Sequence, residues 1–204
     1  MNKRKLTRRQ ELQNLLQEAE SDSILVAELE AVQVCLNKPK HKAVGALLRM
    51  LCPSLRRTTK WFITKVLESI KDERIIRPMM RAAQAPENAE VRSYFLWPLI
   101  KYDCTKHLAY FVNFIVKIED PGEAMMICIM IIRAMKGPFE PELARKSIRK
   151  LLAETKRPAD MEMKVQTEAF RLEAADFIMA KYFNATRRTF WLERNGSVPI
   201  SKTS

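Results

Sequence analysis

Two short stretches of the sequence place aromatic and basic side chains at helical spacing. Neighbouring members are three or four residues apart, and they are Arg57, Trp61 and Lys65 in the first stretch and Tyr94, Trp97 and Lys101 in the second. Side chains at these spacings share one face of an α-helix. Tryptophan rings supply contact area in binding sites, and lysine and arginine bind phosphates or carboxylates. This pattern predicts a binding surface.

The two tryptophans also have a simpler explanation, which is packing between helices. On a helical wheel at about 100° per residue, Trp61 lies nearly opposite the apolar stripe that contains Ile63, and Trp97 lies off the stripe that contains Leu99. In a stack of helices such a side chain can pack against the neighbouring repeat, and large aromatic residues are mostly buried. Packing is therefore the favoured explanation, and binding is the alternative hypothesis.

Chemistry beyond binding has few candidates in the sequence. Only two histidines occur, and nucleophile motifs such as GxSxG and phosphate-binding glycine loops are absent. The cysteines lie far apart, each among apolar neighbours, and they are Cys35, Cys52, Cys104 and Cys128. Free, buried thiols are the expected state of such residues. We therefore predict a protein that is not an enzyme and that holds no metal and no cofactor.

The charge of the chain favours an anionic partner. Lysine and arginine number 36 against 24 aspartate and glutamate residues, which gives a formal net charge of +12. Nucleic acid, an acidic protein surface and a membrane face all fit this charge. However, the basic N-terminus lacks the apolar segment of a signal peptide, and the apolar run Ala124–Ile132 is shorter than the roughly 20 residues that cross a bilayer. We expect a cytoplasmic protein without membrane contact.

Composition and periodicity predict an all-α fold. Only 4 glycines occur, and few runs alternate apolar with polar residues as strands require. Apolar residues instead recur every three or four positions, which indicates helices. The predicted helices span about residues 6–19, 24–36, 41–52, 54–71, 75–83, 89–102, 105–118, 122–136, 141–155 and 161–183.

Two of these helices resemble each other in sequence. An offset of 36 residues (97 minus 61) aligns Trp61 with Trp97 and Lys65 with Lys101. Self-similarity at a period between about 20 and 50 residues indicates stacked repeat units. A further shift of 32 (133 minus 101) places Arg133 at the same position. Lys65, Lys101 and Arg133 are thus predicted to form a ladder along one face.

The stretch 75–103 resembles a HEAT-type repeat, with Pro78 inside the first helix and Glu90, Val91 and Arg92 at the start of the second. The resemblance spans roughly Pro39–Phe183. It implies an armadillo-type α-α superhelix, a HEAT-like solenoid of about four or five antiparallel helix pairs. It also implies that the second helices line the concave side, where the aromatic and basic side chains would lie.

Residues 1–184 are expected to form this single solenoid domain, followed by a C-terminal tail over residues 185–204. The tail lacks a helical stripe, and Phe190, Trp191 and Leu192 are expected to fold back over the last helix pair rather than remain available for a partner. The helix that contains residues 125–132 is apolar all round, which predicts that it is covered on both sides.

The resemblance implies a non-catalytic scaffold or adaptor that holds an acidic protein on its concave face. Small HEAT-like proteins of this kind include chaperone-like binders and bacterial immunity proteins. The alternative is a nucleic-acid-binding protein, including the HEAT-like alkylpurine DNA glycosylases, which hold a damaged base with aromatic and acidic residues. Trp97 and Asp103 resemble such a pair, but six helical residues separate them by about 240° unless the helix ends or kinks at Pro98.

Overall fold

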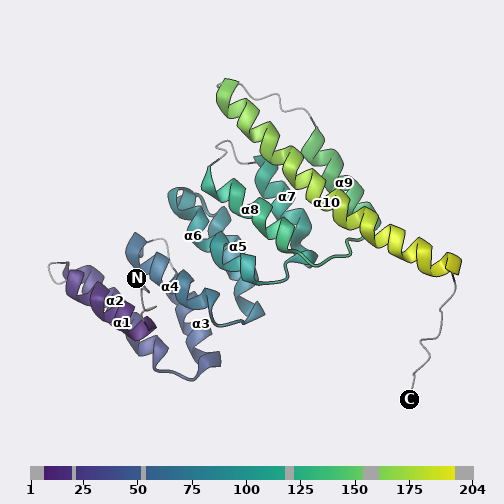
Figure 1. The fold of residues 1–204 in the computed structure, drawn as a ribbon. Helices are drawn as coiled ribbons and strands as arrows, with labels where there is room; N and C mark the ends of the chain where they lie inside the picture. The colour runs from purple at the N-terminus through teal and green to yellow at the C-terminus, as the bar shows by residue number, and fades with distance from the viewer. Residues whose placement is uncertain (1–6, 20–21, 52–53, 118–121, 154–160, 196–204) are drawn as a thin grey trace, which may run out of the picture. The chain divides into compact units, whose positions relative to one another are not determined.

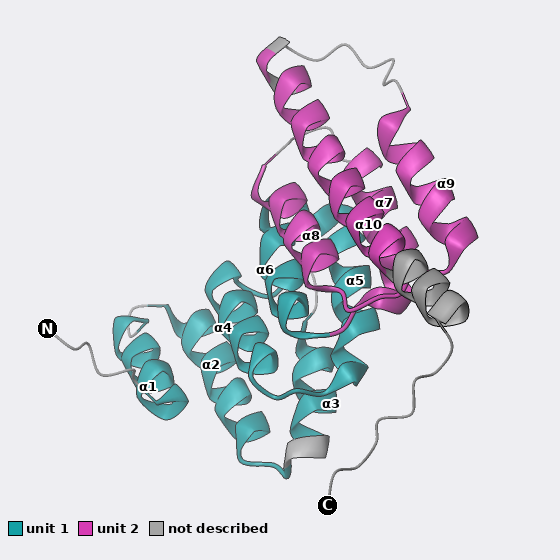
Figure 2. Ribbon diagram, turned by 45° about the vertical axis from the view of Figure 1, so that its right-hand side comes forward, with its two compact units in different colours: residues 1–102 teal, residues 103–204 magenta. Residues whose placement is uncertain are grey.

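The computed structural model describes residues 7–19, 22–51, 54–117, 122–153 and 161–195 (Figure 1). Over these ranges the regular structure is entirely helical, without a strand, which confirms the all-α prediction. Within the same residues, no helix combines the length and the apolar character that crossing a membrane requires. The chain divides into two compact units, Met1–Tyr102 and Asp103–Ser204 (Figure 2). The single domain over residues 1–184 stays a prediction.

Unit 1 contains six α-helices among its described residues, linked in part by short 3₁₀ segments. The α-helices are α1 (Arg8–Glu18), α2 (Ser23–Leu36), α3 (Lys40–Met50), α4 (Arg57–Glu68), α5 (Ile76–Gln84) and α6 (Arg92–Leu96), and the 3₁₀ segments are η1 (Glu73–Ile75), η2 (Pro86–Val91) and η3 (Trp97–Lys101). Contacts join α1 to α2, α2 to α3 and α5 to α6, and α4 contacts both α2 and α6. Alternate helices therefore lie side by side, which is compatible with a helical repeat.

In unit 2, as in unit 1, helices contact both their sequence neighbours and alternate helices. It contains η4 (Thr105–His107), α7 (Leu108–Lys117), α8 (Glu123–Ala134), α9 (Pro141–Leu152) and α10 (Met161–Asn195). Helix α7 contacts α8 and α9 contacts α10, while α7 also lies against α9 and α8 against α10. Two antiparallel pairs are thus stacked on each other.

Each helix buries one apolar stripe against its neighbours. The predicted stripe that contains Ile63 is confirmed, because Phe62, Ile63, Val66 and Ile70 are 0 to 7% exposed. Burying each of these side chains stabilises the fold by about 1.5–3 kcal/mol. Leu29 and Val32 of α2 are fully buried in the same way.

The start of α4 is held by a side chain from α2. The N-cap residue of α4, Arg56, makes no side-chain capping bond of its own. Instead, the Glu28 carboxylate accepts hydrogen bonds from the Arg56 backbone N–H at 3.2 Å and from the Thr59 hydroxyl at 2.6 Å. A carboxylate at a helix N-terminus is favoured by the helix dipole. This contact fixes where α4 begins relative to α2.

The predicted regular helix over residues 89–102 is wrong in its geometry. The chain there forms η2, five residues of α6 and then η3, so 3₁₀ turns flank a short α-helix. Pro98 has no N–H to donate to an α-helical carbonyl, and its ring clashes with the preceding turn. The chain therefore tightens into a 3₁₀ segment at Trp97.

Two further expectations are corrected in unit 2. Helix α10 continues to Asn195, so residues 185–195 are helical rather than a tail, and Phe190–Leu192 do not fold back over it. The side chains of these three residues and the whole of 196–204 lie outside the described residues. In α8, Met126 and Met130 are 43% and 37% exposed, so one side of this apolar helix is uncovered.

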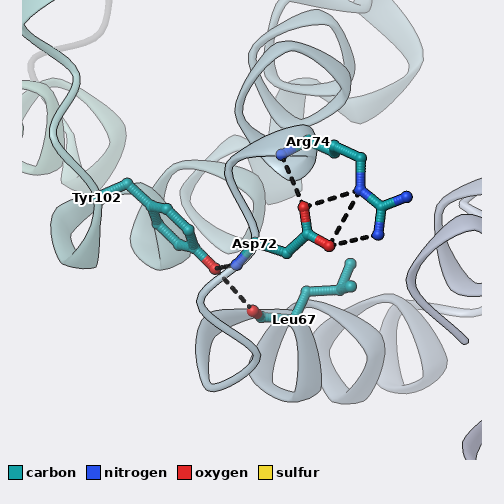
Figure 3. Close-up of polar contacts among 4 residues, drawn as sticks. All are labelled: Leu67, Asp72, Arg74 and Tyr102. Atoms are coloured by element: carbon teal, nitrogen blue, oxygen red, sulfur yellow. Dashed lines mark hydrogen bonds and ion pairs between the residues drawn. The ribbon is translucent and has the colours of Figure 1, made fainter. Parts of the chain in front are cut away.

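A buried tyrosine joins the end of α4 to the end of η3 (Figure 3). The Tyr102 hydroxyl donates to the carbonyl of Leu67 at 3.2 Å and accepts from the Asp72 backbone N–H at 3.3 Å. The Asp72 carboxylate in turn accepts from the backbone N–H of Arg74 at 3.0 Å and from its guanidinium. Burial raises the pKa of Tyr102, because the phenolate loses contact with water. Tyr102 therefore connects two helical segments through its neutral form.

We predict that Tyr102→Phe lowers the free energy of unfolding by about 1–2 kcal/mol, since the hydrogen bonds of the buried hydroxyl to the Leu67 carbonyl and to the Asp72 backbone N–H are both lost. The raised pKa of Tyr102 also makes the stability of the fold depend on pH. The folded chain holds the phenol proton more tightly than the unfolded chain, so this stabilisation is complete below about pH 10 and is lost as the pH rises through the folded pKa. Urea unfolding between pH 7 and 11 measures both effects, with Tyr94→Phe as the control. An unchanged midpoint for Tyr102→Phe would contradict the account.

Candidate binding surface

The first predicted stretch forms an exposed strip on α4, defined by Arg57, Trp61 and Lys65. All three side chains lie on the face opposite the buried stripe, and Trp61 is 40% exposed. The Lys65 ammonium nitrogen lies 4.7 Å from the centre of the Trp61 ring. This is a cation–π contact, which orients the ring at the surface. The structure therefore places the Trp61 and Lys65 side chains next to each other, as the sequence predicted.

Carboxylates from the neighbouring segments face both cations of this strip. Lys65 Nζ lies 3.1 Å from Glu11 Oε1 of α1, and Arg57 Nη2 lies 3.0 Å from Glu90 Oε2 of η2. Exposed pairs of this kind contribute about 0–1 kcal/mol each. They orient the long side chains of Lys65 and Arg57 at the surface.

The second stretch differs from the first in its backbone. Trp97 is 44% exposed, Lys101 is exposed and Tyr94 is half-buried. In a 3₁₀ helix the side chains at positions i and i+3 eclipse one another, whereas those at i and i+4 diverge. The predicted alignment of Trp97 with Lys101 rests on an α-helical geometry that η3 does not have. Because α4 contacts η3, Trp61 and Trp97 nevertheless lie on adjacent segments of unit 1.

Arg133, the last member of the predicted ladder, belongs to unit 2. Its side chain is exposed, and its guanidinium carbon lies 5.4 Å from the centre of the Phe177 ring. The ladder of Lys65, Lys101 and Arg133 stays a prediction. Trp61 and Trp97 expose 40% and 44% of their surface, so packing between repeats does not fully account for either ring.

A pocket that the sequence analysis missed lies beside the strip. Its volume is about 330 Å³, and its lining comes from the start of α4 and from η2, namely Leu55, Arg57, Lys60, Pro86, Glu87, Ala89, Glu90 and Val91. Pockets near 300 Å³ are at the small end of the range for ligand sites. This one has room for a single side chain or a small molecule, with cations, carboxylates and apolar atoms all in reach.

One wall of the pocket contains a buried lysine. Lys60 is 5% exposed, and its ammonium group donates to the side-chain oxygen of Asn88 at 3.1 Å. The Asn88 amide donates in turn to the carbonyl of Ala82 at 3.0 Å. This chain of bonds holds η2 against α4. The sequence did indicate that this lysine could be buried, because Lys60 lies only about 60° from Ile63 on the helical wheel, at the edge of the apolar stripe.

The glycosylase comparison receives no support from Asp103. The helix does end before it, at Lys101, with Tyr102 in extended conformation. However, Asp103 Oδ1 accepts hydrogen bonds from the backbone N–H of Thr105 at 3.1 Å and of Lys136 at 3.4 Å, as well as from the Thr105 hydroxyl. The bond from that hydroxyl is the main cause of the lowered pKa of Asp103. The Asp103 carboxylate is therefore held in structural hydrogen bonds to Thr105 and Lys136.

The described cysteines are buried thiols outside any disulfide, as expected. These are Cys35, Cys104 and Cys128, whereas Cys52 lies outside the described residues. Burial raises the pKa of the Cys128 thiol, which keeps it protonated and unreactive. In the part of the chain that the structure describes, no three His, Cys, Asp or Glu side chains gather as a metal site would require.

Comparison with protein-family models, with curated proteins and with solved structures found no match for this chain. The HEAT-like resemblance therefore stays a prediction. The functional conclusion depends on the geometry of the strip on α4 and of the pocket beside it.

We predict that Lys60→Met lowers the free energy of unfolding by about 1–3 kcal/mol, because the buried Asn88 oxygen loses a charged donor. Lys65→Met on the same helix removes an exposed cation and should cost less than about 1 kcal/mol. Urea unfolding followed by circular dichroism compares the two variants. Equal stability of Lys60→Met and Lys65→Met would show that the Lys60 contact does not hold η2 in place.

Proposed function

We propose that the chain is a non-catalytic binding scaffold that holds an acidic protein partner. In this proposal its helix pairs form a HEAT-like solenoid, with the second helices on the concave side. The contacts between alternate helices within each unit support the stacking that such a solenoid needs. Chaperone-like binders and immunity proteins are examples of this class of scaffold.

The exposed Trp61 is the observation that carries the proposal. A large ring that is 40% exposed, with a lysine ammonium 4.7 Å from its centre, is costly to leave in water and suited to burial by a partner. Tryptophan and arginine are the residues most enriched among those that dominate binding energies. Arg57 stands one turn before Trp61 and also lines the pocket, which could receive one side chain of the partner.

The charges around the strip favour a protein over a nucleic acid. The chain carries a formal net charge of +12, which attracts acidic surfaces. Yet Glu11, Glu87 and Glu90 lie among the cations of the strip and the pocket. A phosphate backbone presents a continuous row of negative charges and would meet these carboxylates. A protein surface can instead offer isolated carboxylates that replace Glu11 and Glu90 as partners of Lys65 and Arg57.

We predict that Trp61→Ala weakens binding of the natural partner by about 30-fold or more, as expected for a central aromatic contact worth about 2 kcal/mol. The partner is first identified by co-purification with the full chain, and the affinity of the purified pair is then measured by calorimetry. Ile24→Ala removes an exposed apolar side chain of α2 and should leave the affinity unchanged.

Two results would contradict the proposal. One is a Trp61→Ala chain that binds the co-purified protein as tightly as the unaltered chain. The other is tight binding of duplex DNA at low salt with a steep loss of affinity as salt is added, which is the behaviour of a phosphate-binding surface.

A further inference from the structure

Helix α10 presents an exposed apolar stripe, defined by Val165, Leu172 and Phe183. These side chains are 61%, 54% and 62% exposed. At about 100° per residue, they point in directions within roughly 20° of one another. The three side chains thus share one side of α10 over five turns, and the exposed Asp176 lies on the same side between Leu172 and Phe183.

The stripe faces away from α8, on the open side of the last helix pair. Phe177 lies near Arg133 of α8, and the ammonium group of Lys181 donates to the Arg133 carbonyl at 2.8 Å. Lys181 is nine residues after Leu172, which places the two about 180° apart on the helix. The stripe therefore occupies the side on which a following helix pair would stack.

Helices α1 and α10 differ in what they expose. The exposed residues of α1 are all polar, namely Arg8, Arg9, Gln10, Gln13, Asn14, Gln17 and Glu18. The exposed side of α10 carries the apolar stripe. Exposed apolar side chains that gather on one side of a helix mark a surface for another protein segment.

The last helix pair also carries opposite charges on its two helices. The exposed basic residues of α9 are Arg145, Lys146, Arg149 and Lys150, with Glu142 as the exposed acid. The exposed acids of α10 between residues 162 and 184 are Glu162, Glu168, Glu173 and Asp176, with Lys164 as the exposed base. Because α9 lies against α10, an acidic and a basic helix stand side by side. Such a surface is complementary to a second copy of itself.

We propose that a second copy of this chain covers the stripe, with α9 of each copy against α10 of the other. A two-fold axis parallel to the helices, between α9 and α10, produces this arrangement. Val165, Leu172 and Phe183 then pack against α9 of the other copy, where they meet Leu152, which is 51% exposed, and the aliphatic parts of the arginine and lysine side chains. The basic face of α9 meets the acidic face of α10 twice. This surface belongs to unit 2 and is independent of the strip on α4.

The test is the mass of the full chain in solution, measured by sedimentation equilibrium at about 50 μM. We expect twice the monomer mass of 23.8 kDa. Leu172→Lys places a positive charge against the basic face of α9 in the other copy and should raise the dissociation constant by roughly 100-fold or more. Val34→Lys makes the same change at a residue of α2 that is 59% exposed, and should leave the dimer intact.

Charge reversal separates this arrangement from other dimers. A chain with Arg145→Glu and Arg149→Glu has two acidic helices, and a chain with Glu173→Lys and Asp176→Lys has two basic ones. Each alone should be monomeric, and an equal mixture should form a heterodimer. A dimer of α10 against α10 predicts no loss in the first chain. The proposal is overturned by an unaltered chain that is monomeric, by a Leu172→Lys chain that remains dimeric, or by a mixture that fails to associate.

Discussion

The structure depends on the burial of one apolar stripe by each of its short helices. Apart from α10, the α-helices have between 5 and 14 residues, and helices of this length are marginally stable alone in water. Their stability comes from contacts such as those of Phe62 and Ile63, which leave these side chains without exposed surface. Once the stripe of α4 is fixed against α2 and α6, the opposite face must point outward. The exposure of Trp61 follows from that constraint.

Polar side chains then fasten the ends of the helices. Arg171 of α10 donates to the carbonyls of Lys150 and Ala153 at the end of α9, at 3.1 and 2.6 Å, and Lys181 donates to the carbonyls of Arg133 and Met135 at the end of α8. These carbonyls have no partner within their own helices, and the negative end of the helix dipole favours a cation there. Burial lowers the pKa of both cations. Neighbouring helices thus supply the bonds that short helices lack.

Periodicity was sufficient to predict the helices and the buried side of α4, because hydrophobic spacing determines which face is covered. It failed at residues 89–102, where Pro98 changes the backbone and so the direction of each side chain. It also failed after Phe183. The residues there lack an apolar stripe of their own, yet they continue helix α10, whose apolar residues lie earlier in the sequence. The pocket could not be predicted, since it requires η2 and the start of α4 to meet in space. Lys60 at the edge of an apolar stripe was the one sign of it.

The central claim is that the stacking of unit 1 leaves Trp61 and Trp97 at the surface while their neighbours Phe62 and Phe95 are buried. Hydroxyl-radical footprinting of the full chain, with each rate divided by that of the same residue in the unfolded chain, tests this most directly. The account predicts strong protection of Phe62 and Phe95 and weak protection of both tryptophans. Equal protection of all four rings would contradict it.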